Sequence, residues 1–141
     1  MSNRISDKFA ELKSAKKSAF VAYICAGDPD YKKSLESMIA LDSAGADIIE
    51  IGVPFSDPLA DGIVNQMASA RALNAGMDVG KTLNLIKAFR QNSNTPIVIF
   101  TYLNPIYNYG FEEFHKEASL HGADGILILD LPPDEQKINN E

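Results

Sequence analysis

Hydrophobic residues gather in short runs that are separated by polar stretches. Four runs have the length of a strand and are rich in Ile, Val, Leu and aromatic residues: 19–26, 46–53, 96–103 and 124–131. None of them alternates cleanly between apolar and polar positions, which is typical of strands in a parallel sheet that is covered on both faces. The pattern therefore predicts four buried, parallel strands.

The segments between these runs carry apolar residues at helical spacing. The spacing predicts one helix that ends near Gly45, a second that begins with Asp78 as its N-cap, and a third that ends near Gly122. Two further helices are expected, one over 5–12 and one over 62–75. Strand and helix then alternate, which predicts βαβ units around a parallel sheet.

A faint internal repeat supports this arrangement. The segments GADIIEIGVP (45–54) and GADGILILDLP (122–132) both start with Gly-Ala-Asp, continue as an apolar strand with an acid, and leave through a proline. The acids are Glu50 and Asp130, and we expect both toward the carboxyl ends of their strands. In parallel α/β folds, active sites and ligand-binding sites lie at that edge of the sheet.

Composition and charge narrow the classes of function. The chain of 141 residues has the size of one domain, with 45% hydrophobic residues and a net charge of −6. Lysines and arginines are scattered among acids, which argues against nucleic acid and anionic membranes as partners. No apolar run is long enough for a membrane span, and the N-terminus does not read as a signal peptide. Because Cys25 is the single cysteine, we expect a cytoplasmic protein without a disulfide.

The segment EIGVPFSDPLADG (50–62) places several carboxylates around one strand end. In a strand, Glu50 shares a face with Ile48 and Gly52, so we expect it to be partly buried. It is either a structural group that pairs with a neighbouring strand, or a general acid/base whose pKa is tuned by burial. Asp57 and Asp61 lie in the following loop, where they either form turns or are held in place by a loop stiffened with prolines.

Aromatic and aliphatic residues near the strand ends also have two interpretations. They form either the core of the sheet or the walls of an apolar pocket for a flat ligand. These residues are Tyr23, Phe100, Tyr102, Leu127 and Leu129. His115 and His121 have no partner at metal-ligand spacing, so no metal site is expected. No GxGxxG, P-loop or GxSxG motif occurs.

The string EIGVPFSDPLADG resembles the signature of the tryptophan synthase alpha subunit family. AFVAYICAGDPD (19–30), TYLNPIYNYG (101–110) and ILILDLPPDE (126–135) resemble its first strand and turn, its third strand-end loop and its fourth. The resemblance implies a (β/α)₈ barrel, the TIM barrel fold, which typically needs about 250 residues. We therefore expect residues 1–141 to be a single domain, the N-terminal half of such a barrel, that stops inside the fourth helix.

The resemblance also implies a reaction. Members of the family cleave indole-3-glycerol phosphate to indole and glyceraldehyde 3-phosphate in tryptophan biosynthesis, by a retro-aldol lyase step that needs no cofactor. Indole then passes to a beta subunit, which carries pyridoxal phosphate, within an α2β2 heterotetramer. Matching positions imply that Glu50 is the proton-shuttling acid/base and that Asp61 bonds the indole N–H. Asp130 matches a family acid at the end of strand four.

Further matches concern the pocket and the partner surface. The implied walls of the indole pocket are the five residues given above. The implied surface toward the beta subunit consists of Pro54, Asp57, Pro58, Asn104 and Asn108. After DPLADG the family usually continues Pro-Thr-Ile-Gln, whereas this chain has IVNQ (63–66).

Three interpretations of a half-barrel stay open. The chain is the half of a lyase that carries both catalytic carboxylates, and it needs the other half because phosphate sites come from the loops after strands seven and eight. Alternatively, it is a non-catalytic module that docks on the beta subunit. In the third interpretation, its open sheet edges keep it from folding stably alone, or two copies close into a barrel-like dimer.

Overall fold

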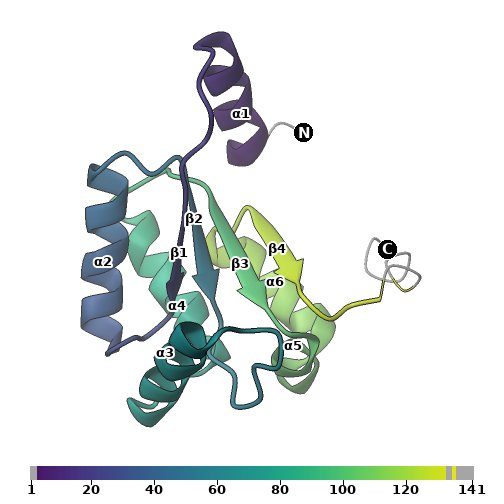
Figure 1. The fold of residues 1–141 in the computed structure, drawn as a ribbon. Helices are drawn as coiled ribbons and strands as arrows, with labels where there is room; N and C mark the ends of the chain where they lie inside the picture. Colours follow the sequence, from purple (N-terminus) through teal and green to yellow (C-terminus); the bar gives the residue numbers. More distant parts are fainter. Residues whose placement is uncertain (1–2, 133–134, 136–141) are drawn as a thin grey trace.

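The computed structural model describes residues 3–132 and 135. The chain begins with α1 (Arg4–Ser14), after which strands and helices follow one another around one sheet (Figure 1). These elements are β1 (Val21–Cys25), α2 (Tyr31–Ser43), β2 (Ile48–Gly52), α3 (Ile63–Asn74), α4 (Val79–Arg90), β3 (Ile97–Thr101), α5 (Leu103–Tyr109), α6 (Phe111–His121) and β4 (Gly125–Ile128).

The four strands form one parallel sheet in the order β1-β2-β3-β4, which confirms the predicted βαβ arrangement. Asp78 caps α4 as predicted, and Asp30 caps α2; they accept the N–H of Lys81 and Lys33, each at 2.8 Å. Gly122 ends α6 in the left-handed conformation, which glycine adopts without strain. The last residues, INNE (138–141), where the sequence stops inside the expected fourth helix, lie outside the described residues.

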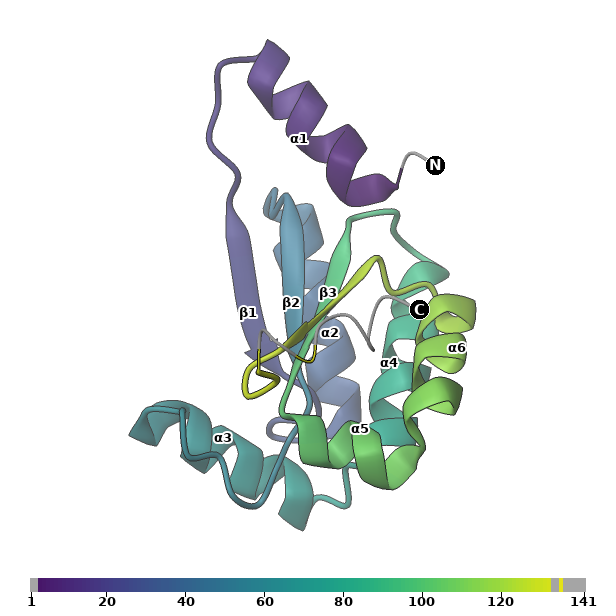
Figure 2. The same ribbon diagram turned by 90° about the vertical axis from the view of Figure 1, so that its right-hand side faces the viewer.

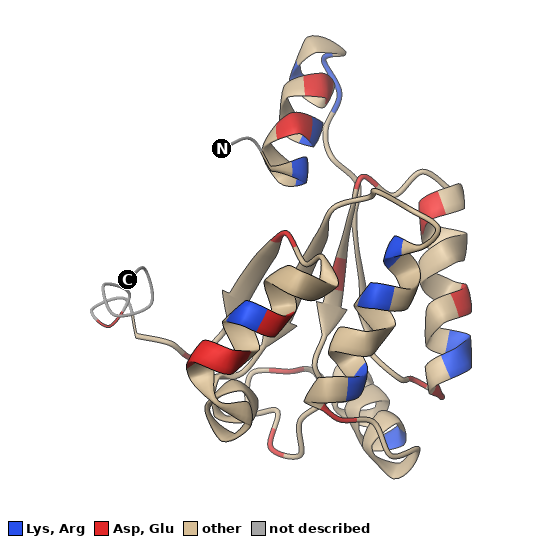
Figure 3. Ribbon diagram, turned by 180° about the vertical axis from the view of Figure 1, so that it is seen from behind, with Lys and Arg blue, Asp and Glu red and all other residues tan. Residues whose placement is uncertain are grey.

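One face of the sheet is closed by helices. Figure 2 shows α2, α4 and α6 on one side of the sheet, with α1 beyond the amino ends of the strands and α3 beyond their carboxyl ends. Ile49, Ile51, Ile97 and Ile99 point into this layer and are fully buried. Burial of each such side chain stabilises the fold by about 1.5–3 kcal/mol. Figure 3 shows lysines, arginines and acids interspersed over the outer surface of these helices.

The opposite face of the sheet is open within residues 3–132. Helix α1 lies near the amino-terminal end of this face, where Ile5 lies close to Gly125, the first residue of β4. Leu127 of β4 is 39% exposed on this face. The expectation that both faces are covered is therefore wrong for the described part of the chain, because its helices gather on one side.

Two local predictions also need correction. The segment TYLNPIYNYG is not only a loop, since Leu103–Tyr109 forms α5. Pro105 is the third residue of this helix, and a first-turn residue has no intrahelical partner for its N–H, so proline fits there. The strands are also shorter than the apolar runs, because residues at both ends of each run belong to the connecting segments, and Leu103 belongs to α5.

Candidate active site

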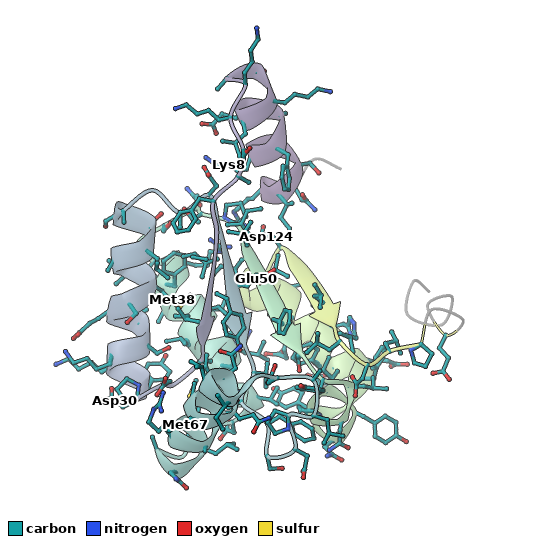
Figure 4. All side chains as sticks on the ribbon, viewed as in Figure 1. Lys8, Asp30, Met38, Glu50, Met67 and Asp124 are labelled. Carbon is teal, nitrogen blue, oxygen red and sulfur yellow. The ribbon has the colours of Figure 1, made fainter. Side chains whose placement is uncertain are left out.

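Glu50 stands in the middle of β2, on the open face of the sheet (Figure 4). Its neighbours Ile49 and Ile51 point to the helical side, and in the strand register Tyr23 and Val98 flank it. Glu50 is partly buried, as expected, although it lies at the centre of the strand and not toward its carboxyl end. Its carboxylate makes no hydrogen bond or ion pair with any residue that the structure describes. The structural pairing that the sequence left open is therefore not observed there.

Asp61 lies in the loop that joins β2 to α3, and this loop is fixed on both sides. The Ala60 N–H donates to the Tyr102 hydroxyl at 2.9 Å, and Gln66 Nε2 donates to the Asp61 carbonyl at 2.8 Å. Burial raises the pKa of the Asp61 carboxyl, while a hydrogen bond from Tyr102 acts in the opposite direction. Gln66 is the residue that IVNQ shares with the usual family string, and in this chain it anchors the loop at Asp61.

The predicted pocket walls fall into two groups. Tyr23, Phe100 and Leu127 lie side by side on the open face, and the rings of Tyr23 and Phe100 meet edge to face with centroids 5.5 Å apart. Tyr102 is buried just beyond β3, with its ring 5.3 Å from that of Phe55. Leu129 extends the chain past β4 and donates its N–H to the Thr101 carbonyl at 2.9 Å.

The charges of Glu50 and Asp61 both affect the pKa of the Tyr23 hydroxyl. After burial and the nearby thiol of Cys25, the charges of Asp61 and Glu50 contribute to the raised pKa of Tyr23. Glu50 lies beside Tyr23 in the strand register, and Asp61, in the loop that follows β2, lies next to Tyr102, another residue of the predicted pocket walls. Such a site can hold a flat apolar ring and present an acid to it from two directions.

A hollow of about 540 Å³ lies between the loop that follows β2, the start of α4 and α5. Its lining includes three of the predicted partner-surface residues, Pro54, Asn104 and Asn108, and two aromatic residues, Phe55 and Tyr109. Sequence reasoning missed the two aromatic residues, although Phe55 stands inside the PFSDP string. The predicted partner surface is thus divided, because Asp57 and Pro58 do not line this hollow.

Asp57 and Pro58 lie in the exposed part of the loop that follows β2. The Asp57 carboxylate accepts the Ser56 hydroxyl at 2.8 Å, a local bond of the kind expected for turn formation. Pro58 lines a neighbouring hollow of about 380 Å³ together with Phe55 and Gln66.

Other acids have structural roles. Asp130 lies two residues beyond β4 and accepts the N–H of Leu103, the first residue of α5, at 2.7 Å. Asp28 accepts two bonds from Arg71 of α3, at 2.7 and 2.8 Å, in addition to standing in the predicted turn. Cys25 is buried, and burial raises the pKa of its thiol to about 11. Between residues 3 and 132, no three His, Cys, Asp or Glu side chains gather as a metal site would require.

Within the described part of the chain, no helix is long and apolar enough to cross a membrane.

Comparison with known proteins identifies the family. The family model described as tryptophan synthase alpha chain matches residues 9–141. Tryptophan synthase subunit alpha from Legionella pneumophila is 40% identical, with a TM-score of 0.93 over 96% of this chain and 52% of its own. A tryptophan synthase structure from M. tuberculosis, in an aminoacrylate-bound form, is 34% identical, with a TM-score of 0.91 over 97% of this chain and 56% of its own.

A mutant tryptophan synthase alpha subunit from the hyperthermophile Pyrococcus furiosus is 45% identical, with a TM-score of 0.82 over 85% of this chain and 49% of its own. The chain thus spans about half the length of the solved structures that it matches, in agreement with the expected half of a TIM barrel. With the parallel sheet and its alternating helices, these matches show that the chain belongs to the tryptophan synthase alpha chain family.

Proposed function

We propose that this chain supplies the two carboxylates that cleave indole-3-glycerol phosphate to indole and glyceraldehyde 3-phosphate. The observation that carries the proposal is the Glu50 carboxylate, which is partly buried on an open face and has no partner among residues 3–132. A carboxylate kept in this way is available to a ligand. A partly buried polar group that no described residue pairs calls for an explanation, and a catalytic role is one such explanation.

The chemistry assigns a different task to each acid. The bond between the indole ring and its side chain breaks when the ring carbon gains a proton and the adjacent side-chain hydroxyl loses one. Glu50 is the group that moves these protons. Asp61 accepts the indole N–H and so stabilises the positive charge that develops at the ring nitrogen. Each acid/base contribution is typically worth about 10²–10⁴-fold in rate.

Aromatic residues hold the ring in this scheme. Tyr23 and Phe100 pack against one face of the indole, Leu127 and Leu129 extend that wall, and Tyr102 steadies the loop that carries Asp61. The proposed reaction uses no metal or organic cofactor. Because the chain spans about half of its relatives, we assign the activity to the complete barrel, in tryptophan biosynthesis in the cytoplasm.

The test is indole release from indole-3-glycerol phosphate by the purified full-length protein. We expect Glu50→Gln and Asp61→Asn each to abolish or strongly reduce the rate, with substrate affinity lowered mainly in Asp61→Asn. Near-normal rates in both variants would contradict the assignment of the site.

The hollow beside Pro54, Asn104 and Asn108 supports a second proposal, that the chain docks on a tryptophan synthase beta subunit. A concave surface of about 540 Å³ on rigid elements suits a protruding side chain of a partner. We expect Asn104→Arg to abolish co-purification with the beta subunit, whereas Asn92→Arg, on the opposite end of the strands, leaves it intact. Binding that is equal in both variants would refute docking at this hollow.

A further inference from the structure

The hydroxyl of Tyr23 has no hydrogen-bond partner in the described part of the fold. It makes no hydrogen bond with any residue between 3 and 132, although most of the side chain is removed from solvent. A phenol that is mostly removed from solvent usually bonds the protein or an ordered water, because an unpaired polar group away from water costs free energy. Such an exception calls for a functional explanation.

The position of this hydroxyl is fixed by its surroundings. A Cβ atom on Gly52 would lie 2.2 Å from Tyr23 Oη, so the end of the ring occupies the space that this glycine leaves free. The edge-to-face contact with Phe100 holds the other side of the ring. A hydroxyl on a ring that is packed in this way is oriented before any ligand arrives, which lowers the entropy lost on binding.

The phenol stands beside the proposed catalytic acids without bonding either of them. Gly52 lies two residues beyond Glu50, about 6.6 Å along the strand and toward the carboxyl edge of the sheet. Burial, together with the charges of Asp61 and Glu50, raises the pKa of Tyr23, so the group keeps its proton at neutral pH. It is therefore a neutral donor next to the place where the ligand meets both carboxylates.

We propose that the Tyr23 hydroxyl donates a hydrogen bond to a hydroxyl oxygen on the side chain of the bound substrate, and so selects ligands with a hydroxylated chain. This inference rests on the proposed function. An indole ring offers an N–H but no oxygen, so a donor in this place has its acceptor on the chain and not on the ring. Tyr23 is then a specificity residue as well as a wall of the pocket.

Two ligands separate this role from simple packing. Indole-3-glycerol phosphate carries two side-chain hydroxyls, and 3-(indol-3-yl)propyl phosphate carries none while keeping the ring and the phosphate. Dissociation constants are measured for both by calorimetry on the full-length protein in a Glu50→Gln background, where the substrate is not consumed. Tyr23→Phe removes one oxygen atom and leaves the ring in place.

We expect Tyr23→Phe to weaken binding of indole-3-glycerol phosphate about fivefold to tenfold and to leave binding of the propyl phosphate unchanged. The control is Tyr31→Phe, a phenol at the start of α2 and away from the open face, which leaves both constants unchanged. The thermal midpoint of the unliganded Tyr23→Phe protein is expected to stay level or rise, because the removed hydroxyl is largely shielded from solvent and has no partner among residues 3–132.

Other outcomes would overturn the inference. Equal weakening of both ligands would make Tyr23 a packing residue, and no weakening would leave its hydroxyl without a role in recognition. A lower thermal midpoint in Tyr23→Phe would show that the hydroxyl bonds another part of the protein. Failure of both ligands to bind when Tyr23 is present would refute the proposed function itself, together with this inference.

Discussion

Replacing Asp124 with alanine is expected to lower the free energy of unfolding by about 3 kcal/mol. Asp124 stands at the start of β4 and accepts hydrogen bonds from Arg90 Nη2 at 2.6 Å, Arg4 Nη1 at 2.8 Å and Ile97 N at 2.9 Å. The side chains of Asp124 and Arg90 are 4% and 10% exposed. The acid therefore joins α4 and the start of β3 through buried bonds, and α1 through the more exposed side chain of Arg4.

The magnitude follows from what the alanine variant leaves behind. Removing one partner of a buried ion pair typically costs about 3–5 kcal/mol, because the other charge stays buried without compensation. Arg90 keeps bonds to the carbonyls of Gly122 and Thr95, at 2.8 and 2.6 Å, which places the expected loss at the lower end. The exposed Arg4 pair adds little, since surface ion pairs are worth about 0–1 kcal/mol.

The internal repeat supplies a matched control. Asp47 has the equivalent position in the first Gly-Ala-Asp and accepts the N–H of Phe20 at 2.8 Å, in an exposed setting. Asp47→Ala is therefore expected to cost only about 1 kcal/mol, the net value of one hydrogen bond. Urea unfolding of the full-length protein, followed by circular dichroism, gives both values. Equal losses in the two variants, or a loss below 1 kcal/mol for Asp124→Ala, would refute this reasoning.

Three further predictions follow from the same structure. Gly52→Ala should destabilise the protein by about 1–3 kcal/mol, because the added Cβ would overlap Tyr23 Oη. Adding Tyr23→Phe to this variant should restore part of the lost thermal midpoint. Ile63→Pro should raise the free energy of unfolding by about 0.4–1 kcal/mol, since Ile63 is the first residue of α3 and Gly62 before it is extended; a lower midpoint would contradict this. Because the pKa of Asp61 is raised, the affinity for indole-3-glycerol phosphate should begin to fall at a higher pH on acidification than it would with an ordinary aspartate. In a plot of affinity against pH, Asp61→Asn should remove this fall.

The sequence predicts most of the elements because their signals are local. Apolar runs mark the strands, and Asp30, Asp78 and Gly122 mark helix boundaries by hydrogen bonds and backbone conformation that involve near neighbours. These signals did not predict α5, a helix of seven residues, and the family resemblance described its segment as a strand-end loop. They also failed for the open face, since a run such as IVIF is apolar whether or not a second layer covers it.

The candidate active site can be predicted only in part from local sequence patterns. The strand period predicts a partly buried Glu50, but not that its carboxylate lacks a partner in the part of the chain described here. The bonds that fix the loop carrying Asp61 and the helix α3 join distant residues, such as Ala60 with Tyr102 and Asp28 with Arg71. No local pattern encodes such pairs, so their geometry needs the folded structure.

The most direct measurement is single-turnover indole formation by the full-length protein and its Glu50→Gln variant, with substrate affinity measured in parallel. Glu36→Gln serves as the control, because Glu36 is an exposed glutamate of α2 that is paired with Lys33 at 2.7 Å. If Glu50 moves the protons, Glu50→Gln slows indole formation by about 10²–10⁴-fold while it still binds substrate, and Glu36→Gln reacts normally. A Glu50→Gln variant that binds substrate and releases indole at the normal rate would contradict the account.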